Sequence, residues 1–180
     1  MTSDPVTTHF LRHTLATLAY RAQKVLRELP PGFAGFRVGP AARTPAQLAG
    51  HLADLLEWAC SIAAGKERWE PASSGQLEAE IARFFAALAR LDTSLAAAAL
   101  PEATARTLFQ GPIADALTHV GQLALLRGLC GAQVRPESYA RSEIVVGRVG
   151  AEQAPARREF DGDASARPRK PPPDAGQGTG

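Results

Sequence analysis

The chain lacks several features that would assign it to a particular class of protein. It has only two cysteines in 180 residues, Cys60 and Cys130, which excludes a disulfide framework and favours reduced thiols in a cytoplasmic protein. It has no run of about 18 or more apolar residues, so we predict no membrane span. Its first residues are polar and soon become amphipathic, so we expect no signal peptide.

Charge and short motifs exclude further classes. The net charge is only +2, and much of the basic excess lies near the C-terminal end, so we predict no nucleic-acid partner. The chain has no glycine-rich nucleotide fingerprint (GxGxxG), no P-loop, no CxxC pair and no GxSxG motif. We also find no β-hairpin signal and no internal repeat, which leaves the helical patterns as the main information on the fold.

Four segments carry apolar residues at helical spacings of three and four. They run from about residue 5 to 28, 45 to 64, 75 to 100 and 111 to 130. Asp4, Thr44 and Ser74 are suitable N-caps, and Gly65 and Gly131 are suitable helix ends. The basic residues of the first segment are interpreted as its solvated face: Arg12, Arg21, Lys24 and Arg27.

These helices predict an all-α fold, a four-helix bundle with antiparallel neighbours, in one domain spanning residues 4–150. The linker from Pro30 to Arg43 is long enough for a crossover connection. Residues 134–150 include a possible short helix, and they are expected to cover a site or to form a homodimer contact. Residues 151–180 are rich in Pro, Gly and Arg, and we predict a disordered tail there.

Three residues of two predicted helices form the strongest candidate for chemistry. His51 lies between Leu48 and Leu55 on the apolar stripe of the second helix, so it faces the core. Asp115 and His119 are four residues apart and share one face of the last helix. Together these three side chains predict a site for a divalent metal ion with open coordination positions.

The donor set restricts the identity of such an ion. Two imidazoles and one carboxylate suit zinc, nickel, iron or manganese better than calcium. Gln47, Asp54 and Gln122 each lie within a turn of a ligand and could orient an imidazole. A metal-free network of the same histidines and aspartate remains the alternative, because an aspartate and a histidine four residues apart are common on helices.

The two segments that carry these residues resemble the DinB/YfiT-like superfamily of helical bundles. Residues 44–54, TPAQLAGHLAD, resemble the second helix of that family, and residues 119–127, HVGQLALLR, resemble its HxGQ signature. The resemblance covers about residues 4–131 and implies a metal site that usually has three histidines. His51 and His119 match two of them, and Asp115 stands at the third position.

The resemblance also implies several functions. Members of the family include metal-dependent transferases of low-molecular-weight thiols such as bacillithiol, mycothiol or glutathione, and a mycothiol-dependent maleylpyruvate isomerase. The substrate thiol would be the nucleophile, and an electrophilic small molecule would accept it. Because Asp115 departs from the family pattern, a non-catalytic bundle with a degenerate metal site remains open, as does a metal-dependent hydrolase.

Overall fold

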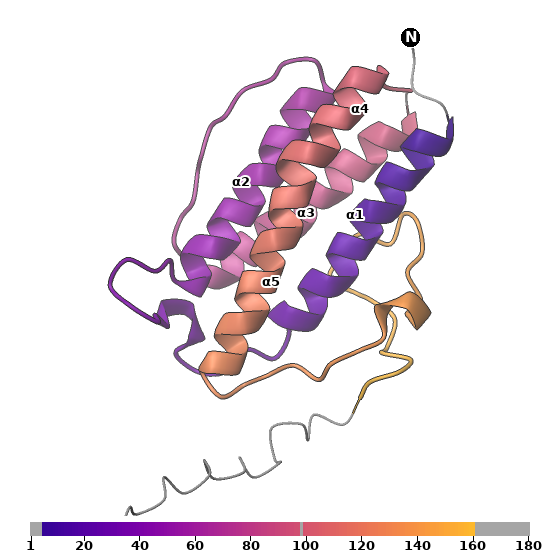
Figure 1. Ribbon diagram of the computed structural model, residues 1–180. Helices are drawn as coiled ribbons and strands as arrows, with labels where there is room; N and C mark the ends of the chain where they lie inside the picture. The colour runs from indigo at the N-terminus through magenta and orange to yellow at the C-terminus, as the bar shows by residue number, and fades with distance from the viewer. Residues whose placement is uncertain (1–4, 98, 161–180) are drawn as a thin grey trace, which may run out of the picture.

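The computed structural model describes residues 5–97 and 99–160 (Figure 1). Its helices are α1 (Pro5–Leu26), α2 (Pro45–Ala63), α3 (Leu77–Ala97), α4 (Glu102–Leu108) and α5 (Ala114–Leu129), with short turns η1 (Phe33–Gly35), η2 (Phe109–Ile113) and η3 (Tyr139–Arg141). No strand occurs among these residues, and none of their helices is both long and apolar enough to cross a bilayer. The predicted predominance of helix is confirmed.

Local signals explain where α2 begins and where α2 and α5 end. The backbone N–H of Gln47 donates to Thr44 Oγ1 at 3.2 Å, and the N–H of Thr44 donates to Gln47 Oε1 at 3.0 Å. This reciprocal pair satisfies two donors that the first turn of α2 would otherwise leave free. Gly65 and Gly131 follow α2 and α5 with φ of 67° and 84°, a conformation that favours glycine. The predicted second helix is therefore confirmed at both ends.

The last predicted helix begins earlier than the sequence suggested. Instead of starting near Gly111, the helical path starts at Glu102 and passes through the π-helical turn η2 before α5. Pro112 lies inside this turn, where its missing N–H cannot make the usual bond to a residue four positions earlier. The extra residue in the π turn changes the rotation of α5 relative to α4, and Asp115 follows two residues later.

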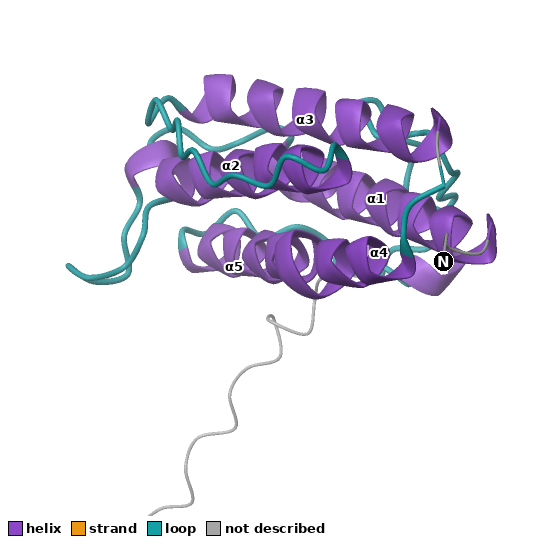
Figure 2. Cartoon of the chain, turned by 90° about the horizontal axis from the view of Figure 1, so that it is seen from above, coloured by secondary structure: helices purple, strands orange, loops and turns teal. Residues whose placement is uncertain are grey.

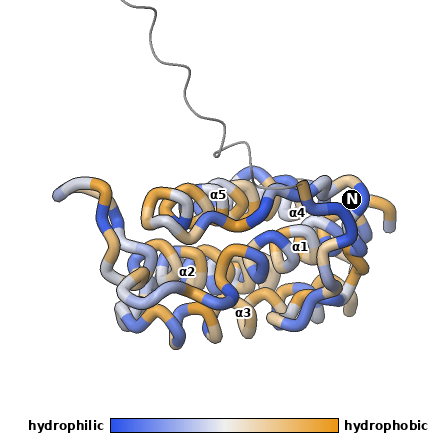
Figure 3. The backbone as a smooth tube through the Cα atoms, turned by 90° about the horizontal axis from the view of Figure 1, so that it is seen from below, coloured by the Kyte–Doolittle hydropathy of each residue, from blue (hydrophilic) through white to orange (hydrophobic). Residues whose placement is uncertain are grey.

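The four long helices pack around one shared core. Each contacts two neighbours, in the circular order α1, α3, α2 and α5. Seen from above, α3 and α5 lie on opposite sides of the layer formed by α1 and α2 (Figure 2). Orange apolar stretches recur along all of these helices in Figure 3, as the helical spacing predicts. The largest fully buried side chains include Phe33, Phe84, Leu52, Leu88, Leu108 and Leu123.

The chain direction differs from the predicted antiparallel arrangement, because α2 and α3 run the same way. Residues 64–76 form a connector that returns along α2 (Figure 1). Contacts follow this path in reverse order: Ser61 Oγ accepts from the N–H of Arg68, and Asp54 Oδ1 accepts from the N–H of Ala72. The crossover is therefore this connector, and the linker from Pro30 to Arg43 instead joins the ends of α1 and α2 that lie at the same end of the bundle (Figure 1).

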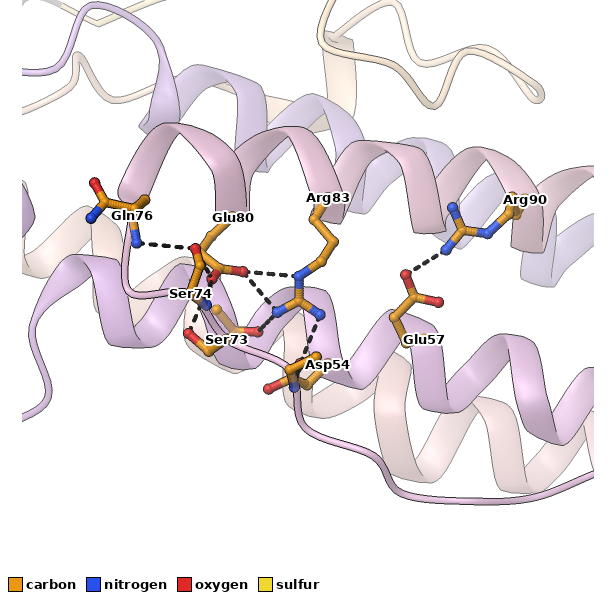
Figure 4. Close-up of polar contacts among 10 residues, drawn as sticks. Asp54, Glu57, Ser73, Ser74, Gln76, Glu80, Arg83 and Arg90 are labelled. Carbon is orange, nitrogen blue, oxygen red and sulfur yellow. Dashed lines mark hydrogen bonds and ion pairs between the residues drawn. The ribbon is translucent and has the colours of Figure 1, made fainter.

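A buried network fastens the connector to both helices (Figure 4). Arg83 of α3 binds Asp54 of α2 at 2.7 Å and Glu80 of its own helix at 2.7 Å. Glu80 also accepts hydrogen bonds from the hydroxyls of Ser73 and Ser74 in the connector, at 3.1 and 2.8 Å. Burial raises the pKa of Glu80, but hydrogen bonds from Arg83 and Ser74 outweigh it and hold the pKa at about 2.

Residues 134–160 pack along α1, which corrects the interpretation of its basic face. Lys24 Nζ lies 2.7 Å from Glu137 Oε2 and 2.6 Å from Glu159 Oε1, and its side chain is only 5% exposed. Arg12 pairs with Asp92 of α3 at 2.8 Å. The C-terminal segment adds the single-turn η3 in place of the possible short helix. The segment covers α1, because Glu137 forms an ion pair with Lys24 of that helix.

The described chain continues past residue 150, where the composition predicted the start of the tail. Residues 151–160, expected to be part of the tail, belong to the described chain, and Glu159 forms an antiparallel bridge with Glu137 as well as its pair with Lys24. The pair with Lys24 attaches this end of the segment to α1. The remaining tail, residues 161–180, lies outside the described residues, as does the predicted N-cap Asp4.

Candidate metal centre

The fold brings together the three residues that the sequence singled out. One ligand atom from each of His51, Asp115 and His119 lies within 4.8 Å of the others. His51 Nε2 is 3.7 Å from Asp115 Oδ2, and His119 Nε2 is 3.3 Å from Asp115 Oδ1. The two imidazole rings lie 4.7 Å apart between centroids, at an angle of 78°. These residues come from α2 and α5, which are neighbours in the bundle.

The spacing of these atoms fits a bound metal ion. Two ligands of a tetrahedral zinc ion at bond lengths of about 2.0–2.1 Å lie about 3.3 Å from each other. The distances of 3.3 and 3.7 Å from Asp115 to the two imidazoles are close to that separation. The two distances go to different oxygens of Asp115, and the ligand atoms of the three residues all lie within 4.8 Å, so the group could hold an ion after the side chains adjust. Three protein ligands would leave coordination positions for another molecule.

The site is partly buried, and this affects His51. The side chains of His51 and His119 are 22% and 12% exposed, whereas Asp115 is 47% exposed at the rim. Burial lowers the pKa of His51, and the nearby His119 and Arg43 lower it further, against the opposing effects of Asp115 and Asp54. A histidine that is neutral at physiological pH keeps a free lone pair for a metal.

One predicted supporting residue contacts a ligand, and two do not. Gln122 Oε1 lies 2.7 Å from His119 Nδ1, and an amide oxygen only accepts, so Nδ1 is the donor. This tautomer leaves the lone pair on His119 Nε2, the atom that faces Asp115. Gln47 instead caps α2, and Asp54 binds Arg83 and the connector. The predictions for Gln47 and Asp54 were therefore wrong, because both side chains have stronger local partners.

An open pocket of about 530 Å³ lies directly beside the imidazoles. His51, His119, Gln122 and Arg43 supply its polar lining, and Leu48, Leu125 and Leu126 are among its apolar lining residues. A second pocket of about 500 Å³ also contains both His51 and Arg43. A metal ion at this site would thus be reachable by a small molecule.

The sequence interpretation missed two residues next to the candidate ligands. Arg43 lines the pocket of the two histidines and immediately precedes the N-cap of α2. Its position next to a predicted helix start on the helix of His51 could have identified it from the sequence. Trp69 lies in the connector, with its ring 5.8 Å from that of His51 and 5.9 Å from that of Trp58. No local pattern places Trp69 there, because it reaches His51 only through the return of the connector along α2.

The cysteines and the remaining histidines lie apart from this cluster. Burial raises the pKa of Cys60 to about 11, which makes a thiolate unfavourable at neutral pH. Cys60 and Cys130 are half-buried, and neither lines the pocket of the imidazoles. His9 and His13 are exposed on α1. Among the described residues, the candidate site therefore consists of His51, Asp115 and His119 and includes no cysteine.

Comparisons of the chain with known protein families, curated proteins and solved structures give no match. The resemblance of residues 44–54 and 119–127 to the DinB/YfiT-like superfamily accordingly stays a prediction from the sequence. The function has to be inferred from the geometry and chemistry of the site.

Proposed function

We propose that this protein binds one divalent metal ion through His51, Asp115 and His119. The observation that carries the proposal is the meeting of three suitable ligand atoms, from two helices, within 4.8 Å. Gln122 supports it by fixing one imidazole tautomer, as second partners of metal-binding histidines do. The donor set is compatible with zinc, nickel, iron or manganese, and the two nitrogens disfavour calcium.

Elemental analysis of the purified, tag-free protein tests this directly. We expect about one equivalent of metal in the wild type and a loss of that metal in the His119→Ala variant. His13→Ala is the matched control, because this histidine is exposed on α1 and should leave the metal content unchanged. A wild type that stays metal-free after loading with zinc, nickel, iron and manganese would overturn the proposal and leave a metal-free polar network.

For the reaction, we propose the transfer of a low-molecular-weight thiol to an electrophilic small molecule. A divalent ion would supply acidity to a thiol that coordinates it, which favours the nucleophilic form at neutral pH. The chain would contribute the ligands and the open pocket that leads to the two imidazoles. The raised pKa of Cys60 supports a nucleophile from the substrate, and the family resemblance of residues 44–54 and 119–127 supports a thiol.

A conjugation assay separates this reaction from the alternatives. We expect the metal-loaded protein to accelerate the reaction of glutathione or a related thiol with monochlorobimane, and His119→Ala to lose the acceleration. Hydrolysis of an activated ester without any thiol would instead favour a metal-dependent hydrolase. Metal binding with neither activity would favour a non-catalytic bundle, consistent with the departure at Asp115.

A further inference from the structure

Arg43 holds an unusual position among the basic side chains. It is exposed at the start of α2 and lines both pockets that contain His51. Several other arginines of the bundle form ion pairs: Arg83 with Asp54, Arg12 with Asp92, and Arg106 with Glu102. Within residues 5–97 and 99–160, no carboxylate forms an ion pair with Arg43. Its guanidinium is therefore available to a ligand.

The charge of the pocket also favours an anionic ligand. Asp115 is the only acidic member of the candidate ligand set, so a divalent ion there would leave a net positive charge. Arg43 adds a second positive charge at the same pocket. Asp54 lines the second pocket, but its carboxylate is already bound by Arg83 and by the N–H of Ala72. Such a field attracts anions and repels cations.

The shape of a guanidinium makes this attraction selective. Its planar fork can donate two parallel hydrogen bonds to a carboxylate or a phosphate group. Other residues of the lining are apolar, among them Leu48, Leu126 and the 63% exposed Leu125. A ligand suited to this pocket carries an anionic group at one end, a short apolar part, and a donor atom that reaches the imidazoles.

We propose that Arg43 binds the anionic group, a carboxylate or a phosphate, of the small molecule that enters the pocket beside His51 and His119. This inference rests on the proposed metal centre and specifies the substrate class of that same site. It makes Arg43 a determinant of substrate binding, separate from the residues that hold the ion.

Two simple thiols test the proposal, 3-mercaptopropionate and its uncharged analogue 3-mercaptopropanamide. Their affinities for the cobalt(II)-loaded protein are measured from the near-ultraviolet cobalt–thiolate absorption. The preference is the ratio of the affinity for the carboxylate to the affinity for the amide. We expect this ratio to be about tenfold smaller in the Arg43→Gln variant than in the wild type, with unchanged affinity for the amide. Comparing the ratio between the two proteins removes the intrinsic difference between the thiols. Arg106→Gln, on the exposed face of α4, should keep the wild-type ratio.

The cobalt content of each protein distinguishes a failure of the metal centre from a failure of the role of Arg43. Arg43→Gln should bind as much cobalt as the wild type, since Arg43 is not among the candidate ligands. If the wild type binds no cobalt, this inference fails, and the proposed metal centre fails with it if zinc, nickel, iron and manganese do not bind either. If cobalt binds and the preference is the same in both proteins, only the role of Arg43 is overturned. If cobalt binds but neither thiol does, the proposed thiol reaction is overturned together with the role of Arg43.

Discussion

The hydrogen bond between Gln122 and His119 orients the imidazole of His119. By accepting from Nδ1 at 2.7 Å, Gln122 fixes both the ring orientation and the tautomer of His119. We predict that Gln122→Leu lowers the metal affinity by about tenfold or more, because the Nε2 lone pair is no longer held toward Asp115. Competition with a chromophoric chelator measures this affinity.

Thr118→Val provides the control for that substitution. Thr118 is an exposed neighbour on α5, and its hydroxyl donates only to the carbonyl of Ala114 one turn earlier. The metal affinity of this variant should equal that of the wild type. An equal affinity in Gln122→Leu as well would show that packing alone orients His119.

Glu80 is the residue whose loss should most affect stability. Its side chain is 1% exposed and accepts hydrogen bonds from Arg83, Ser73 and Ser74. We expect Glu80→Gln to lower the free energy of unfolding by about 2–3 kcal/mol, since a buried, charge-assisted network loses its anion. Urea unfolding measures the change. The control is Glu57→Gln, whose exposed pair with Arg90 joins the same two helices and should contribute less than about 1 kcal/mol.

The difference between the wild type and Glu80→Gln should depend on pH. The pKa of Glu80 is about 2 in the folded protein, below its ordinary value of 4.5. The carboxylate therefore stabilises the fold fully above about pH 4.5, and this contribution is lost as the pH falls from 4.5 toward 2. A difference that stays constant across this range would contradict the assigned role of the carboxylate.

At the scale of elements, the contact between α2 and the connector depends on a glycine. A Cβ on Gly50 would lie 2.1 Å from Ser73 Oγ and 2.8 Å from Ser73 Cβ. Because rotation of the Ser73 side chain cannot remove the second clash, the backbone of the connector would have to move. We predict that Gly50→Ala lowers the free energy of unfolding by about 1–3 kcal/mol in thermal or urea denaturation.

Two further variants make this test specific. Gly121→Ala on α5 meets nothing within 4 Å, so the better helix propensity of alanine should stabilise the protein by about 0.5–1 kcal/mol. Adding Ser73→Gly to Gly50→Ala removes the clashing side chain and should recover part of the lost stability. Destabilisation by Gly121→Ala, or no recovery in the double variant, would contradict the close approach of connector and helix.

The sequence predicted the helices and the candidate site because both depend on local spacing. Thr44 and Gln47 identify the start of α2, and the four-residue interval between Asp115 and His119 places both on one face. The position of His51 in an apolar stripe was enough to bring it to the core side of α2. The π turn was not predictable in this way, because Pro112 after a glycine is also a common start of a helix.

At the scale of the whole molecule, the chain directions could not be read from local patterns. The segments before α2 and before α3 are both long, so either could have crossed the length of the bundle. The choice follows from long-range contacts such as Asp54 with Ala72 and Arg83. The packing of residues 134–160 on α1 was not predictable for a related reason. In the sequence, Lys24, Glu137 and Glu159 look like solvated charges, and only the fold brings them together as ion pairs.

This packing on α1 leads to a prediction about where the folded chain ends. A chain that stops at Gly150 lacks Glu159, one of the two carboxylates that bind the 5% exposed Lys24. Compared with a chain that stops at Phe160, we expect its free energy of unfolding to be lower by about 1–2 kcal/mol. Urea denaturation of both chains measures the difference, with Glu159→Gln in the longer chain as the comparison. A loss of similar size in that variant would assign the effect to the ion pair, whereas equal stability of all three proteins would place the end of the folded chain at residue 150, as the composition of the sequence suggested.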